Sequence, residues 1–334
     1  MNADFGSRKS ILKTPVLVIV VLLAVGIPLL LDSYALYMIS LFLVTMVVVA
    51  GLNVVFGFAG QASLGSAAFM GIGAYTTAVL GARLGVPFPA AVVAGGLVAM
   101  LMGIVIGFPA LRVSGFYLIL VTMAFLGAAQ VVFIQWTGVT GGAQGMATPT
   151  PALGPVSLED PASMYYFLLV VAVAIFLVIR NLMDSKTGRA FIAIRENEIA
   201  AQSLGVSLAR YKVFAFAFSS LVAGLGGGLY TGIVRFIDPS SFGIPAAISH
   251  VLYMVVGGPG SIWGPVVGSA LVLNAVLLQG FDKYREAAYA GVLIVFLVFA
   301  PWGIVGLAKT ARNAFSAYLA RQARRMRIAI NGSK

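Results

Sequence analysis

Residues 34–84 read YALYMISLFLVTMVVVAGLNVVFGFAGQASLGSAAFMGIGAYTTAVLGARL, and Arg83 is their only charged side chain. Two apolar runs, residues 34–58 and 66–84, flank a short break rich in glycine and small polar residues. A helix of about 20 apolar residues crosses the roughly 30 Å of hydrocarbon in a bilayer. This stretch therefore predicts two membrane-spanning helices joined by non-helical backbone.

The composition extends this pattern to the whole chain. Of the 334 residues, 60% are hydrophobic and only 9% are charged. A soluble domain has about a quarter of its residues charged, so an ordinary soluble enzyme is excluded. There is no cysteine and one histidine, which excludes disulfides and thiolate metal sites and leaves no ligand set for a metal. We expect an all-α bundle of membrane helices that binds no metal or cofactor of its own.

Breaks in hydropathy divide the chain into about ten spans, with eight as the lower bound. The predicted spans are residues 15–31, 34–58, 66–84, 87–109, 115–136, 162–179, 213–234, 244–256, 262–279 and 287–306. The run 244–256 is short enough for a partial or re-entrant helix. On this division, residues 1–14 form an N-terminal segment, 15–306 the membrane domain and 307–334 a basic tail.

The basic residues orient these spans. With the N-terminus inside, all but four of the 21 Lys and Arg residues fall on the inner side; the four are Arg83, Arg235, Lys283 and Arg285. Inner segments of membrane proteins carry such an excess, so both termini are predicted to be cytoplasmic. The net charge of +11 is then explained by the membrane topology. The basic tail is expected to contact anionic lipid or solvent rather than nucleic acid.

Charged residues are missing from the predicted membrane interior. A proton- or sodium-driven carrier usually keeps an ionisable group at mid-membrane, so we expect the energy source to lie in another polypeptide. A membrane enzyme needs a nucleophile and a base. The sole histidine, His250, neighbours Ser249 on a different helix face, which favours a structural role. A self-sufficient ion-coupled carrier and a membrane enzyme or sensor remain the alternatives.

Two glycine-rich breaks, residues 57–66 and 257–265, interrupt the apolar runs in separate halves of the chain. Non-helical backbone at membrane depth is tolerated where it is buried in protein or lines a watery cavity. Two such breaks predict a translocation path; tight loops at the inner surface are the alternative. The candidate path residues are neutral: Gly60, Gln61, Ser63, Gly65, Ser66, Thr122 and Gln130.

Two loops stand out by length. The inner loop, residues 182–212, contains an amphipathic segment expected to form a helix over 188–205, with Gly205 as its end. Ser207 is expected to cap a second short turn that runs to Tyr211. The outer loop, residues 137–161, is either a docking surface for an external partner or a simple connector.

The inner loop resembles a known motif. Glu198-x-Ala200-Ala201-x-x-x-Gly205 is similar to the EAA motif of ABC importer permeases, whose coupling helix docks onto an ATPase. With it, blocks at 188–201, 60–75, 140–145 and 257–268 resemble the branched-chain amino acid permease family of the LivH/LivM type. Residues 115–117 and 195–197 favour the larger, LivM-type subunit. The chain departs from the family pattern at Ser66, where many relatives have histidine.

The resemblance implies a permease subunit without catalytic residues, which forms the path of an ATP-driven importer. The implied partners are a second, LivH-type permease, two cytoplasmic ATPases that bind ATP and magnesium, and a periplasmic or extracellular binding protein, all at a bacterial inner membrane. Branched-chain or related neutral amino acids are the implied substrates, with urea or short amides as the alternative. The implied ATPase-coupling residues are Arg195, Glu196, Glu198, Ala200, Ala201 and Gly205.

Overall fold

A computed structural model describes residues 31–270 except Ser114 and Pro155, and also residues 26, 28, 291, 294 and 303–307. The predicted spans 15–31 and 287–306 therefore lie largely outside the described residues, and the span 262–279 is described only as far as residue 270. The N-terminal segment 1–14 and, after residue 307, the basic tail also lie outside the described residues.

Helices make up most of the described chain. The long ones are α2 (Ser33–Leu52), which continues into a π-helix (Asn53–Phe58), α3 (Ser66–Leu84), α4 (Phe88–Gly107), α5 (Phe116–Gln135), α7 (Pro161–Asp184) and α10 (Leu208–Val234). The shorter ones are η2 (Pro109–Leu111), α6 (Thr137–Thr140), η3 (Gly142–Gln144), α8 (Lys186–Glu196), α9 (Glu198–Ser203), η4 (Pro239–Phe242), α11 (Ile244–Gly257) and α12 (Gly264–Ser269).

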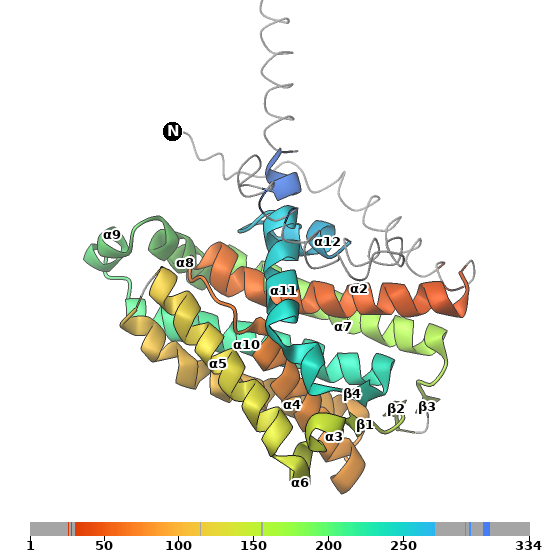
Figure 1. Cartoon of the computed structure of the whole chain (residues 1–334). Helices are drawn as coiled ribbons and strands as arrows, with labels where there is room; N and C mark the ends of the chain where they lie inside the picture. The colour runs from red at the N-terminus through yellow and green to blue at the C-terminus, as the bar shows by residue number, and fades with distance from the viewer. Residues whose placement is uncertain are drawn as a thin grey trace, which may run out of the picture.

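Four two-residue strands complete the fold. β1 (Met146–Ala147) pairs antiparallel with β4 (Phe236–Ile237), and β2 (Ala152–Leu153) pairs antiparallel with β3 (Val156–Ser157). The first pairing places Met146 opposite Ile237 and so joins the loop after α5 to the end of α10. The strands lie at one end of the bundle, and α8 and α9 lie at the other end (Figure 1).

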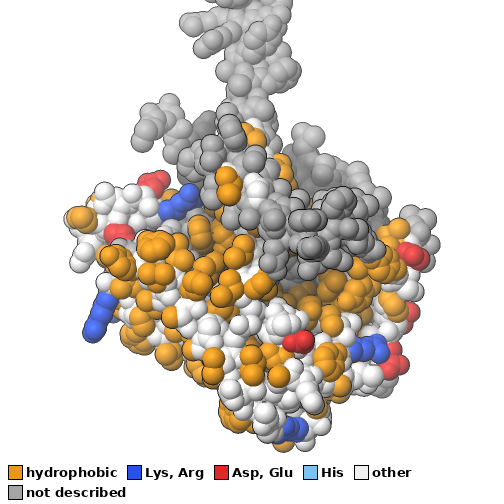
Figure 2. Space-filling model, in the orientation of Figure 1, with side chains coloured by type: hydrophobic (Ala, Val, Ile, Leu, Met, Phe, Trp, Pro, Cys, Tyr) orange, Lys and Arg blue, Asp and Glu red, His pale blue; other side chains and the backbone are white. Residues whose placement is uncertain are grey.

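Six of the described helices are long and apolar enough to cross a membrane. They correspond to predicted spans 34–58, 66–84, 87–109, 115–136, 162–179 and 213–234, which confirms a polytopic helical membrane protein. On the face shown in Figure 2, hydrophobic side chains cover a broad central band, while most charged side chains lie toward its left, right and lower edges. That distribution suits a lipid-facing belt between two wet ends.

The predicted boundaries fail at two of these helices. α7 extends to Asp184 rather than residue 179, and α10 begins at Leu208 rather than residue 213. The short turn expected after Ser207 is the first turn of α10 itself, with Ser207 at its N-cap position. Hydropathy identifies only the apolar part of a helix, so it does not predict polar turns that extend beyond the membrane.

α10 is the central helix, and glycines bring its neighbours close. A Cβ added at Gly73 of α3 would overlap the backbone of Gly224 in α10. A Cβ added at Gly227 of α10 would overlap the backbone of Met70 in α3. Small residues permit such approach between membrane helices, where packing replaces the hydrophobic effect. Gly224 and Gly227 therefore serve helix packing.

Candidate functional site

The segment after α7 forms two helices rather than the single helix expected over 188–205. The break falls at Asn197, whose side chain accepts a hydrogen bond from Ala200 N (3.0 Å) and so caps α9. An asparagine at an N-cap satisfies a backbone amide that would otherwise lack a partner at the helix start. This local bond explains why the chain turns there, so the single-helix prediction is wrong.

α8 is held against α10 through an apolar face. Phe191 is fully buried, and its ring meets those of Tyr211 and Phe214 in the first turns of α10 at centroid distances of 6.2 and 6.3 Å. Gly188 lies so close to the backbone of Met183, at the end of α7, that a Cβ would overlap it. Movement of α8 is thereby tied to α7 and α10.

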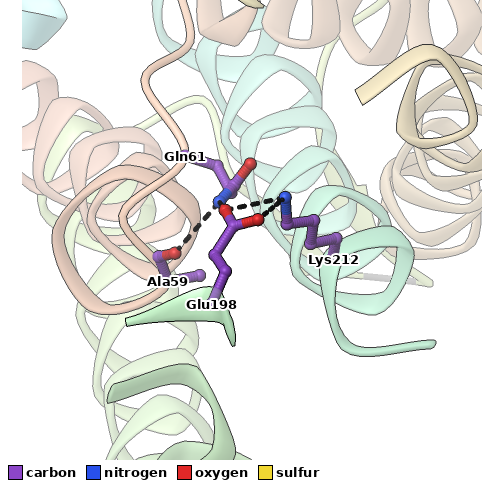
Figure 3. A network of polar contacts seen from close by, with 4 residues as sticks. All are labelled: Ala59, Gln61, Glu198 and Lys212. Carbon is purple, nitrogen blue, oxygen red and sulfur yellow. Dashed lines mark hydrogen bonds and ion pairs between the residues drawn. The ribbon is translucent and has the colours of Figure 1, made fainter. Parts of the chain in front are cut away.

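At the start of α9, an ion pair points into the protein. Both carboxylate oxygens of Glu198 lie 2.8 Å from Lys212 Nζ, and Gln61 Nε2 donates to Glu198 Oε1 at 3.4 Å (Figure 3). Lys212 is 3% exposed, whereas the Glu198 side chain is 37% exposed. Gln61 also donates to Ala59 O at 3.4 Å. Three segments therefore meet at one carboxylate: the first glycine-rich break, α9 and α10.

The two glycine-rich breaks, although about 200 residues apart in the sequence, touch each other here. Asn53 Nδ2 donates to Ser261 O (2.8 Å), and Gly260 N donates to Asn53 Oδ1 (2.9 Å). Arg195, in the last turn of α8, donates through Nη1 to Gly57 O. The site thus contains both breaks and the end of α8, which the sequence placed in three separate regions.

The predicted path residues divide into groups. Thr122 Oγ1 of α5 accepts from Leu64 N (3.0 Å), and Ser63 Oγ accepts from Gly65 N (3.1 Å). These bonds satisfy the non-helical backbone of the first break. Ser63 and Thr122 are 2% and 0% exposed, so in this conformation they serve the backbone from within the protein.

Ser66 and His250 form a buried pair. Ser66 Oγ lies 3.2 Å from His250 Nδ1 and joins the start of α3 to α11. Ser249 instead donates to Pro245 O on its own helix, as its different helix face predicts. This bond ties two helices together, which agrees with the structural role expected for His250.

Gln130 lies apart from the other path residues. Its Nε2 donates to Pro239 O of η4 at 3.4 Å, toward the strand end of the bundle. Along α5 it is eight residues beyond Thr122, a rise of about 12 Å. The predicted path residues therefore do not form one cluster.

The predicted coupling residues also differ in exposure. Ala201 is 2% exposed, whereas Glu196, Ala200 and Gly205 lie at the surface. Next to them Ile199 and Leu204 are 79% and 84% exposed, an apolar surface on a helix that stands away from the bundle. A groove of about 500 Å³ lies between α9 and the start of α10, with Glu198 and Lys212 among its lining residues.

Two residues of the site were missed by sequence reasoning, Asn53 and Lys212. Asn53 is the only amide side chain in the apolar run 34–58, a signal that was available. Lys212 was assigned to the inner loop as one more topological charge, and nothing in its spacing indicated burial. Among the described residues, no cluster of three His, Asp or Glu side chains is placed to hold a metal ion.

Comparison with known proteins agrees with the motif resemblance. Residues 34–302 match a family model described as branched-chain amino acid transport system / permease component. The high-affinity branched-chain amino acid transport system permease protein LivM of Escherichia coli (strain K12) is 31% identical over 314 residues, 86% of this chain and 74% of that protein. LivM of Salmonella typhimurium is 32% identical, with coverage of 76% and 66%.

A more distant relative is the ribose import permease protein RbsC of Haemophilus influenzae, 26% identical over 64% of this chain and 67% of that protein. No solved structure matches the chain. The family match covers most of the sequence, including both breaks and the α8–α9 segment. The chain therefore belongs to the family of permease components of branched-chain amino acid transport systems.

Proposed function

We propose that this chain is the LivM-type permease subunit of an ATP-driven importer and forms part of the path for branched-chain or related neutral amino acids. The observation that carries the proposal is the connection of α8 and α9 to both glycine-rich breaks. Arg195 donates to Gly57 O and also lies against Gly260 of the second break, and Glu198 contacts Gln61 and Lys212. A motor that moves α8 and α9 would therefore act directly on non-helical backbone inside the bundle.

The chemistry of the first break suits a substrate without net charge. Gln61, Ser63, Ser66 and Thr122 offer hydroxyl and amide groups, and all four are at most 4% exposed. Opening of the bundle would bring such groups to a zwitterion without an opposite charge that would hold it. ATP can favour the open conformation only through a motor that contacts the two conformations differently.

The topology proposed is ten spans with both termini in the cytoplasm, in a bacterial inner membrane. In it, residues 182–212 form the cytoplasmic coupling loop, and residues 137–161 face the periplasm, where a substrate-binding protein would dock. The six described membrane helices place these loops at opposite ends of the bundle, as this arrangement requires (Figure 1).

The proposed partners are a second, LivH-type permease and two ATPases that carry ATP and magnesium. The exposed side chains of Ile199 and Leu204 would seat α9 on one ATPase, because burial of a leucine contributes about 1.5–3 kcal/mol. The exposed Ala200 has a short side chain that would allow close contact with the ATPase, and the buried Ala201 faces the bundle. Energy would then enter the permease through α9.

The test is uptake by the assembled complex in sealed liposomes. The chain, a LivH-type permease, the ATPases and a binding protein are reconstituted, and leucine, urea and acetamide are offered in turn. We expect leucine to accumulate only when ATP is present on the ATPase side. Accumulation of urea or acetamide but not leucine would overturn the amino acid assignment while leaving the importer mechanism in place.

The control is the chain alone in liposomes under a proton or sodium gradient. Concentration of leucine under those conditions, without nucleotide, would establish an ion-coupled carrier and overturn the proposal. No accumulation by the chain alone, together with ATP-dependent accumulation by the complex, supports it.

A further inference from the structure

The joint between the two glycine-rich breaks is built from two side chains, Asn53 and Arg195. We propose that these residues lock both breaks to α8 as a single unit, so that they are the positioning residues through which movement of α8 reaches both breaks together. This inference rests on the proposed function, in which α8 and α9 receive movement from an ATPase.

Asn53 and Arg195 provide hydrogen-bond partners for backbone groups of both breaks. Where a helix is broken inside a membrane protein, its freed backbone groups need hydrogen-bond partners, and side chains can supply them. Gly57 O accepts a hydrogen bond from Arg195, and Ser261 O accepts one from Asn53 Nδ2, whereas Gly260 N donates to Asn53 Oδ1. One group belongs to the first break and two to the second.

The two breaks and these two side chains fit closely together. A Cβ at Gly57 would overlap Asn53 Oδ1 and Gly260 N, and a Cβ at Gly260 would overlap Arg195 Nη1. A Cβ at Gly60 would lie 2.9 Å from Arg195 Cγ. Glycine at these positions therefore lets Arg195 lie across both breaks and Asn53 span them. Neither break can shift far without displacing the same two side chains.

Arg195 lies at the end of α8, next to the turn into α9. It occupies the last turn of α8, two residues before the Asn197 break and three before Glu198. α8 itself is fixed to α10 through Phe191. A change in the angle between α8 and α9 would therefore displace Arg195. Because α11 ends at Gly257, where the second break begins, α11 would move together with the first break.

α8 offers a matched control for Arg195. Arg189 lies on the same helix, and its Nη1 donates to Asp184 O at 3.3 Å at the surface, away from the breaks. Arg195→Gln and Arg189→Gln each remove one positive charge from α8. Only the first removes a contact with the breaks, and Arg195→Lys retains a charged donor for partial rescue.

The experiment measures leucine uptake and ATP hydrolysis in the same reconstituted complex. In Arg195→Gln we expect hydrolysis to continue, while leucine carried per ATP falls about tenfold, the factor that loss of one charge-assisted hydrogen bond gives. Arg195→Lys should recover part of the loss, and Arg189→Gln should match the unmodified complex. A merely structural role would lower hydrolysis and uptake together, so unchanged leucine per ATP in Arg195→Gln overturns the inference.

A double variant tests whether the two side chains act as one joint. Asn53→Leu keeps a similar volume and removes both amide bonds. If the residues form one unit, leucine carried per ATP in Arg195→Gln/Asn53→Leu should be no lower than in the more impaired of the two single variants. Independent sites add in free energy, so a double variant whose fold-loss is the product of the two single fold-losses overturns the inference.

Two measurements distinguish failure of this inference from misfolding of a variant and from failure of the proposed function. Hydrogen exchange at Gly260 N–H is expected to speed up in Arg195→Gln, although its direct partner Asn53 is unchanged, and an unchanged exchange rate would overturn the joint even without transport data. Failure of the unmodified complex to couple uptake to ATP would instead overturn the proposed function.

Discussion

Glu198→Gln should destabilise the chain more than removal of its partner, although both changes break the same ion pair. The reason is unequal burial: Lys212 is 3% exposed, and the Glu198 side chain is 37% exposed. Glu198→Gln leaves an ammonium without a countercharge inside the protein. Lys212→Met leaves a carboxylate that water can reach.

The magnitudes follow from that difference. Breaking a fully buried pair costs 3–5 kcal/mol, and an exposed pair contributes about 0–1 kcal/mol. The glutamine oxygen of Glu198→Gln can still accept from Lys212 Nζ, so we expect a loss of about 2 kcal/mol, below the fully buried range. Lys212→Met should cost about 1 kcal/mol or less. The double variant should resemble Lys212→Met, because no buried charge remains.

The assay is the free energy of unfolding in mixed detergent micelles as the denaturing detergent is raised. Glu196→Gln is the matched control, since Glu196 is an exposed acid two residues away and its loss should change stability by less than about 0.5 kcal/mol. The reasoning is refuted if Lys212→Met costs more than Glu198→Gln, or if Glu198→Gln is as harmless as Glu196→Gln.

Three further outcomes are expected. Ser66→Ala removes the hydroxyl that faces a buried histidine and should cost about 1–2 kcal/mol in the same unfolding assay, whereas Ser249→Ala, at an exposed hydroxyl, should change stability by less than about 0.5 kcal/mol. Gly227→Ala forces a methyl group into the α3 backbone and should lower the yield of folded protein; Gly127→Ala, with open space around its position, should be neutral or stabilising by up to about 1 kcal/mol. Leu204→Ser, at a side chain 84% exposed, should leave stability unchanged and weaken ATPase retention on co-purification about tenfold, and equal retention would contradict docking through α9.

The spans show how much local sequence can predict. The expected helix over 66–84 is α3 with the same bounds, because Gly65 and Gly85 end an apolar run of membrane-spanning length. The EAA-like motif was equally readable, because its residues lie within eight positions of one another. Length, hydropathy and short-range spacing are properties of a single segment, so they do not depend on the rest of the fold.

The kink at Asn197 and the polar ends of α7 and α10 were missed for a different reason. At each of these positions the chain can either continue the helix by another turn or end it with a side-chain hydrogen bond to the backbone, such as an N-cap bond. The sequence contains both alternatives. Phe191 of α8 also packs against Phe214 of α10, and this contact cannot be read from the segment itself.

The sequence by itself therefore determined the class of protein, the six described membrane helices and the family, since apolar length and short motifs carry that information. Only the tertiary structure decided that Asn53, Arg195 and Gly260 meet at one joint and that the carboxylate of Glu198 turns inward to Lys212. Those contacts join residues 14 to 207 positions apart. No local periodicity specifies such a partner, because it is chosen by how whole helices pack and by which buried polar groups that packing leaves to be satisfied.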